Sequence, residues 1–278
     1  MKEYLFSDRI CTDYGGYKRL ADFYNWCLKF RDQQIRLSFN DLEFFDGNMC
    51  ALLQAMMYKL YYSRNISFAT DYDILRQKFE VMFRNGFIES NNDDDRQSVV
   101  PIKAFSPDSK EQFVDYVDNY LLCHRGVPEH LDANLKAKIS DDLLEIFCNV
   151  NFHANTKELL FVGGQYYPKQ KTLKFTMVDL GDGFLPKINK ATNGLIDNAL
   201  SAINWAVEGN SSKSLEQTPG GLGLKNIYSY CKEKLGVLQI ATGNGFWSSD
   251  YENSLFEGGR IIQNPFIGTT INLFFTNN

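Results

Sequence analysis

The sequence has few of the residues that build metal or disulfide frameworks. Its 278 residues include three histidines and six cysteines, and no two cysteines stand in a CxxC pair. This scarcity excludes the common zinc-site spacings and gives no reason to expect a disulfide scaffold. We therefore expect reduced, buried thiols, as is usual in cytoplasmic proteins.

Long apolar runs and an excess of basic charge are also missing. No stretch approaches the roughly 20 apolar residues that cross a bilayer, and the first residues lack the apolar core of a secretory signal. Acidic residues number 34 against 29 lysines and arginines, for a formal net charge of −5. A general nucleic-acid binder usually has a basic face. We expect a cytoplasmic protein with neither nucleic acid nor membrane as a partner.

In residues 1–90, segments with the apolar spacing of a helix alternate with segments that have the apolar–polar alternation of a strand. This order favours a small α/β domain. The polar, acidic stretch at 91–98 has no periodicity, and we interpret it as a linker. The expected elements of the first domain are helices at about 17–28, 46–62 and 73–83, and strands at 34–39 and 66–69.

Residues 99–278 are expected to form a second, larger α/β domain. Its first strand, at 99–105, contains a proline, which suits the edge of a sheet. Hydrophobic spacing predicts the elements that follow. The helices are expected at about 108–122, 132–154, 194–207 and 220–234, and the strands at 159–166, 172–180, 236–242, 255–264 and 268–276.

Three polar residues stand four apart in the expected helix at 132–154: Glu145, Asn149 and His153. This spacing places them on one helix face. An asparagine oxygen at Asn149 is a suitable ligand for Mg²⁺, which prefers oxygen ligands and usually shares them with substrate phosphates. Glu145 could orient or deprotonate a water that attacks a γ-phosphate. The alternative is an ordinary polar stripe, with His153 as a structural or capping residue.

A carboxylate ends the expected strand at 172–180, and glycines follow it. Asp179 at this position could accept a proton from the exocyclic amino group of adenine and so discriminate against guanine. Gly181 and Gly183 would let the backbone turn sharply and approach a base ring. The alternative is an ordinary tight turn, because aspartate and glycine are typical turn residues.

A glycine-rich stretch opens the expected helix at 220–234. Exposed amides at a helix N-terminus form an anion site, and Lys213 in the preceding polar stretch could add charge. The alternative is a simple helix start. The chain contains neither the P-loop pattern GxxxxGKS/T nor a GxGxxG after a first strand. The glycine-rich stretch consists of Gly220, Gly221, Leu222, Gly223 and Leu224.

The order of the three motifs resembles the GHKL superfamily of gyrase, Hsp90, histidine kinases and MutL. Residues 145–149 resemble its N box, 179–183 its G1 box and 220–224 its G2 box. The stretch Gly268-Thr269-Thr270 resembles a short element in which Thr269 would support the adenine aspartate through water. With His153 after it, the N box is most similar to that of the anti-sigma-factor serine kinases.

The resemblance implies a Bergerat-type α/β sandwich, with a mixed sheet covered by helices on one face. It implies ATP and Mg²⁺ between sheet and helices, with Asn149 as the metal ligand, and a mobile lid at about 185–219. The first domain is similar to STAS-like domains around Asp46. There, Gly47 and Asn48 replace the serine that is phosphorylated in anti-sigma antagonists. A docking module and a structural cap both stay open for this domain.

Several functions are compatible with these motifs. One is a slow Mg²⁺-dependent ATPase, with Glu145 activating water, whose nucleotide state controls a protein partner. A second is an ATP-gated interaction module without turnover, and a third is a serine kinase of the anti-sigma type. A domain that has lost nucleotide binding is the fourth. Nucleotide-dependent dimers are common in the superfamily, so the resemblance also leaves a homodimer open.

Overall fold

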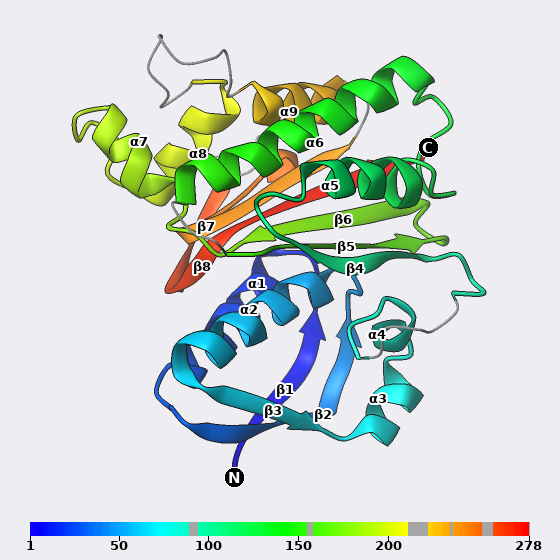
Figure 1. Cartoon of the computed structure of the whole chain (residues 1–278), viewed down its shortest axis with the longest axis vertical. Helices are drawn as coiled ribbons and strands as arrows, with labels where there is room; N and C mark the ends of the chain where they lie inside the picture. Colours follow the sequence, from blue (N-terminus) through cyan, green and yellow to red (C-terminus); the bar gives the residue numbers. More distant parts are fainter. Residues whose placement is uncertain (89–93, 155–157, 211–221, 234–235, 252–257, 278) are drawn as a thin grey trace.

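The structure is a computed structural model of the whole chain. It describes residues 1–88, 94–154, 158–210, 222–233, 236–251 and 258–277. Helices and strands alternate in it, which confirms the α/β class (Figure 1). None of the described helices combines the length and the apolar character needed to cross a bilayer.

The N-terminal part is a parallel three-stranded sheet with helices packed on it. Its strand order is β1-β2-β3, and both pairs are parallel. Parallel neighbours need a crossover between them, and α1 and α2 supply the crossovers here. The elements are β1 (Lys2–Ile10), α1 (Tyr14–Cys27), β2 (Gln33–Phe45), α2 (Met49–Arg64), β3 (Ile66–Thr70), α3 (Tyr72–Lys78) and α4 (Val81–Arg84).

Two features of this part differ from the expectation. No strand was expected at β1, because the exposed Asp8 stands between its buried members Phe6 and Ile10 and interrupts the alternation. The expected helix at 73–83 is two short helices, since Phe79 leaves the helical conformation at φ −132° and ψ 49°.

The C-terminal part is a five-stranded sheet in the order β4-β5-β6-β8-β7, and the helices of this part lie on one face of it (Figure 1). Its strands are β4 (Val99–Phe105), β5 (Leu160–Tyr167), β6 (Thr172–Asp179), β7 (Val237–Ser248) and β8 (Gly259–Thr276). Its helices are α5 (Lys110–Tyr116), which continues as a π-helical turn at Val117–Leu121, α6 (Ala133–Ala154), α7 (Leu185–Ala191), α8 (Ala199–Val207) and α9 (Gly223–Glu233). As expected, the proline-containing strand β4 lies at the edge.

The expected mixed sheet is wrong for this part, because every described pair of its strands is antiparallel. Chain-adjacent strands β5 and β6 pair directly, as do β7 and β8, and such connections reverse the strand direction. The two tail strands expected at 255–264 and 268–276 are one strand, β8, which bends at Gly268 (φ +61°) without leaving the sheet. The sequence analysis also missed α7.

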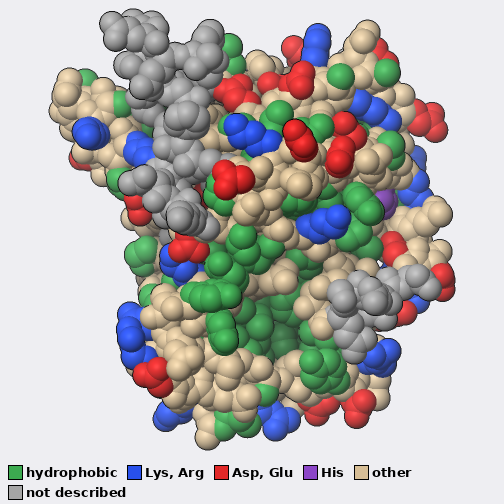
Figure 2. Space-filling model, in the orientation of Figure 1, with side chains coloured by type: hydrophobic (Ala, Val, Ile, Leu, Met, Phe, Trp, Pro, Cys, Tyr) green, Lys and Arg blue, Asp and Glu red, His purple; other side chains and the backbone are tan. Residues whose placement is uncertain are grey.

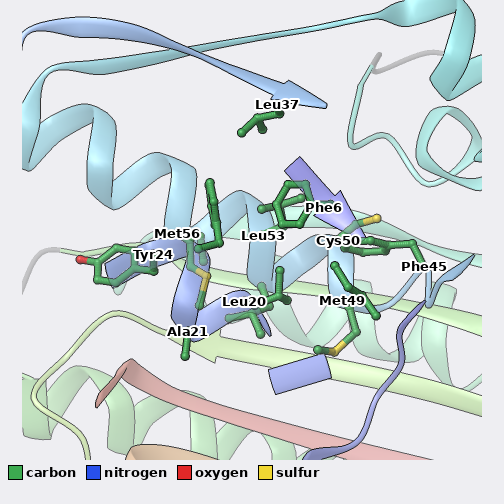
Figure 3. Close-up of a cluster of buried hydrophobic side chains, with 14 of the residues drawn as sticks. Phe6, Leu20, Ala21, Tyr24, Leu37, Phe45, Met49, Cys50, Leu53 and Met56 are labelled. Atoms are coloured by element: carbon green, nitrogen blue, oxygen red, sulfur yellow. The ribbon is translucent and has the colours of Figure 1, made fainter. Parts of the chain in front are cut away.

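The two faces of the five-stranded sheet are covered by different parts of the chain. Helices α5, α6, α8 and α9 lie over one face, and α1 and α2 lie over the other (Figure 1). The core of the N-terminal part therefore continues into the sheet: Phe161 on β5 and Val178 on β6 belong to the same buried cluster as Leu20 and Met56. Figure 3 shows how Leu20, Met49, Leu53 and Met56 meet between these layers.

A buried ion pair joins the N-terminal part to the back of the sheet. The Oδ2 atom of Asp46 lies 2.9 Å from Nζ of Lys174 on β6 and also accepts hydrogen bonds from Thr12 N (2.6 Å) and Thr12 Oγ1 (2.7 Å). Gly47 N donates to Oε1 of Gln165 on β5 at 2.8 Å, and a Cβ at Gly47 would lie 1.9 Å from that oxygen. The turn at Asp46 and Gly47 thus faces the C-terminal sheet.

Apolar and charged side chains are distributed unevenly over the surface. Apolar side chains gather in a hollow where the N-terminal part meets the five-stranded sheet, whereas charged side chains crowd the helix layer above it (Figure 2). Tyr61 and Tyr62, at the end of α2, are the exposed aromatic residues of that helix. Charged side chains also line the lower rim of the N-terminal part, so the apolar hollow lies between two charged edges in this view (Figure 2).

Candidate functional site

Asp179 is a buried carboxylate at the end of β6. Its side chain is 9 % exposed, and its Oδ1 accepts a hydrogen bond of 2.8 Å from Gly181 N. Burial raises the pKa of Asp179 to about 6, while hydrogen bonds from Gly181 and Thr269 act in the opposite direction. Burial thus disfavours the charged form of this carboxyl, and the two hydrogen bonds favour it. A carboxylate can accept about four hydrogen bonds, so acceptor capacity is left for a ligand.

Two glycines shape the backbone around this carboxylate. Gly183 has φ +76° and Gly268 has φ +61°, a region that L side chains rarely adopt. A Cβ at Gly268 would lie 1.9 Å from the carbonyl oxygen of Asp179, and a Cβ at Gly183 would lie 2.4 Å from Thr242 Oγ1. The glycine at 183 is thus required by its turn and by its contact, while Gly181 contributes its N–H group.

Thr269 lies beside Asp179, and the structure adds Thr242 to the pair. The register of the sheet pairs Thr269 with Asp179 on one side and with Thr242 on the other. Thr242 Oγ1 lies 3.2 Å from Thr269 Oγ1, and Thr242 is buried. Sequence reasoning missed Thr242, because it stands in no motif and a single threonine at the end of an expected strand is not distinctive.

Helix α6 carries Glu145 and Asn149, one turn apart as expected. Glu145 Oε1 accepts a hydrogen bond of 3.1 Å from Leu222 N. The Asn149 Oδ1 atom is buried and finds no hydrogen-bond partner among the residues that the structure describes. A buried oxygen without a partner is costly, so Asn149 fits a role as the ligand of a hard cation. The side chain of His153 lies outside the described residues.

The start of α9 packs closely on α6. A Cβ at Gly223 would lie 2.8 Å from the Asp142 carbonyl oxygen and 3.1 Å from Glu145 Cβ, so this position has no space for a side chain. Asn226 Nδ2 donates to Asp142 Oδ1 at 2.8 Å. Leu224 is buried in the core, whereas the Leu222 side chain is exposed. Gly220, Gly221 and Lys213 lie outside the described residues, as do residues 211–219 of the expected lid.

The sites on the sheet and on α6 lie at one end of the domain. The C-terminal turns of α6 cross above the end of the sheet at which β6 finishes, and α7 and α8 flank the same end (Figure 1). Lys187 on α7 also belongs here: burial lowers its pKa, while the charges of Asp182 and Asp179 act to raise it. Sequence reasoning missed this cation, which stands in no motif.

A groove of about 500 Å³ runs between α6 and α9; its lining includes Asp142 and Asn226 but not Asp179 or Asn149. Within the described ranges, no group of three or more histidine, cysteine, aspartate and glutamate side chains is arranged to hold a metal ion. Comparison with family models, with curated proteins and with solved structures found no match.

Proposed function

We propose that this protein binds ATP with Mg²⁺ between the end of the five-stranded sheet and helices α6 and α9, and hydrolyses it slowly. The observation that carries the proposal is the buried carboxyl of Asp179, which accepts the Gly181 N–H beside the bends at Gly183 and Gly268. A buried acceptor of this kind suits a base with an exocyclic amino group, and adenine has one where guanine has a carbonyl oxygen.

The proposed metal ligand is Asn149. Its unpartnered buried oxygen supports this role, because Mg²⁺ takes oxygen ligands and is usually shared with substrate phosphates. When bound, Mg²⁺ would neutralise part of the phosphate charge. The N–H groups at the start of α9, including that of Leu222, would donate to the phosphates, since amides at a helix N-terminus favour anions.

Glu145 is the proposed base for hydrolysis. Its carboxylate now accepts the Leu222 N–H that a phosphate oxygen would also need. A phosphate at this amide would therefore displace Glu145, which could then take a proton from an attacking water. This exchange predicts that nucleotide binding and activation of Glu145 occur together.

A second candidate function is an ATP-gated interaction module without turnover. The contact between Glu145 and Leu222 favours it, because binding alone would rearrange the junction of α6 and α9. In such a module, ATP binding would control the binding of a protein partner or the pairing of two copies of the chain. A serine kinase of the anti-sigma type is a further alternative.

We place the protein in the cytoplasm, in line with its six free cysteines.

Phosphate release separates hydrolysis from gating. Wild type, Glu145→Ala and the exposed control Glu111→Ala on α5 are incubated with Mg-ATP, and free phosphate is followed over hours. The hydrolysis proposal predicts turnover that Glu145→Ala loses and Glu111→Ala keeps. Equal rates in all three proteins would contradict it. ATP binding without turnover in the wild type would favour gating, and transfer of label to a co-purified protein would favour the kinase.

A further inference from the structure

We propose that Thr242 is a positioning residue for adenine recognition: its hydroxyl holds Thr269 and the turn after β6 so that Asp179 presents an acceptor to the base. This inference rests on the proposed nucleotide function and extends it to a residue outside the three motifs. Thr242 would not touch ATP. It would act through Thr269, which lies between it and Asp179.

The geometry places Thr242 where three segments meet. Its Oγ1 lies 3.1 Å from the carbonyl oxygen of Gly268, 3.2 Å from Thr269 Oγ1 and 3.3 Å from Phe184 N. The side chain is 1 % exposed, so water does not compete for these contacts. One hydroxyl on β7 thus ties the turn after β6 to the bend of β8.

The number of hydroxyl and amide protons limits which group can donate in each of these contacts. A threonine hydroxyl has one proton to donate and two lone pairs to accept with. Phe184 N–H donates to Thr242, which leaves the Thr242 proton for Thr269 Oγ1 or for the Gly268 carbonyl. An ionised Asp179 can only accept, so the Thr269 proton goes to Asp179. The Thr242 hydroxyl then has two acceptors for its one proton, the Gly268 carbonyl oxygen and Thr269 Oγ1, and Thr269 in turn donates to the carboxylate.

This chain would affect which base is bound. Donation from Thr269 stabilises the ionised form of Asp179 and opposes the effect of burial on its pKa. An ionised Asp179 attracts the amino group of adenine and repels the carbonyl oxygen that guanine presents at the same position. Without the Thr242 hydroxyl, Thr269 loses the neighbour that orients its own hydroxyl toward Asp179, and Asp179 becomes a less stabilised and less oriented acceptor.

The test compares Thr242→Val, Thr242→Ser and Thr270→Val with the wild type. Valine keeps the shape of threonine without its hydroxyl, and serine keeps the hydroxyl. Thr270 is a matched control, because it is equally buried and its Oγ1 has no hydrogen-bond partner among the described residues. The measurements are calorimetric affinities for ATP and GTP between pH 5.5 and 8, and the Asp179 carboxyl pKa from an NMR titration of the nucleotide-free protein.

We expect Thr242→Val to bind ATP about tenfold more weakly, since one hydrogen bond near a charge is worth roughly that factor. Its ATP-to-GTP preference should fall and its Asp179 pKa should rise, while Thr242→Ser and Thr270→Val match the wild type. A folded Thr242→Val with wild-type preference and wild-type pKa would overturn the inference. The Asp179 pKa can also rise in Thr242→Val while neither the wild type nor any variant binds ATP. That result would support the hydrogen bonds from Thr242 through Thr269 to Asp179, and it would overturn both the nucleotide proposal and the adenine role of Thr242.

Discussion

Replacing Asp179 with asparagine should make the nucleotide-free protein more stable while it removes ATP binding. The side chain is buried, and its pKa is about 6 instead of 3.8. Each pKa unit corresponds to about 1.4 kcal/mol, so ionising this carboxyl in the folded protein costs about 3 kcal/mol at neutral pH. Asparagine has nearly the same shape without the charge, and its oxygen can keep the bond from Gly181 N.

The sign of the effect depends on pH. An acid whose pKa is raised by folding contributes stability below its unfolded-state pKa and loses that contribution as the pH rises through its folded-state pKa. The free energy of unfolding of the wild type should therefore lose about 3 kcal/mol, relative to Asp179→Asn, between about pH 4 and pH 7.5. The two proteins should be nearly equal in stability at the acid end of this range.

Urea unfolding at a series of pH values, with and without Mg-ATP, tests both halves of this prediction. ATP should raise the stability of the wild type by about 2.7 kcal/mol at a hundred times its dissociation constant. In Asp179→Asn this shift should vanish, because the oxygen stays with Gly181 and the amide presents a donor to the adenine amino group. The exposed Asp115→Asn on α5 is the control and should resemble the wild type. An Asp179→Asn protein that gains no stability at pH 7.5 and keeps its ATP shift would refute the reasoning.

Three further substitutions test other parts of the account. Gly268→Ala should lower the unfolding free energy by about 2 kcal/mol or more and weaken ATP binding, because its Cβ would meet Asp179 O at 1.9 Å. Thermal melting measures the loss of stability, and calorimetry measures the loss of ATP affinity. An unchanged melting temperature would contradict this prediction. Glu145→Gln should slow phosphate release at least about tenfold, yet bind ATP as tightly as the wild type or more tightly; weaker binding would argue against competition for Leu222 N–H. Lys174→Met should cost about 3–5 kcal/mol in urea unfolding by leaving the buried carboxylate of Asp46 without its cation, and adding Asp46→Asn should restore part of the loss.

Local patterns predicted most of the helices and strands between residues 99 and 278. The helix at α6 has regular apolar spacing, and the expected range 132–154 differs from Ala133–Ala154 by one residue. Strand β1 could not be found this way, since its outward-facing residues are polar and apolar without order. The fusion of two expected strands into β8 depends on Gly268, whose positive φ bends the strand and which also reads as a turn in the sequence.

The candidate site likewise contains residues that stand in local motifs and residues that do not. Asp179, Gly183 and Glu145 stand in short motifs, so the sequence alone is sufficient to select them as candidates. Thr242 acquires its role from neighbours on two other segments, and no local pattern reports such contacts. The ion pair between Asp46 and Lys174 joins residues 128 positions apart. The attachment of the N-terminal part to the back of the sheet was for that reason beyond prediction from one sequence.

Calorimetric titration of the wild-type chain with ATP, with and without Mg²⁺, tests the central claim most directly. The account predicts saturable binding of one ATP per chain, weaker binding without Mg²⁺ and little binding of GTP. It also predicts that Asn149→Ala makes ATP binding insensitive to Mg²⁺, because this residue supplies the proposed metal ligand. Absence of ATP binding in Mg²⁺, or equal affinity for ATP and GTP, would contradict the assignment of Asp179 as the adenine acceptor.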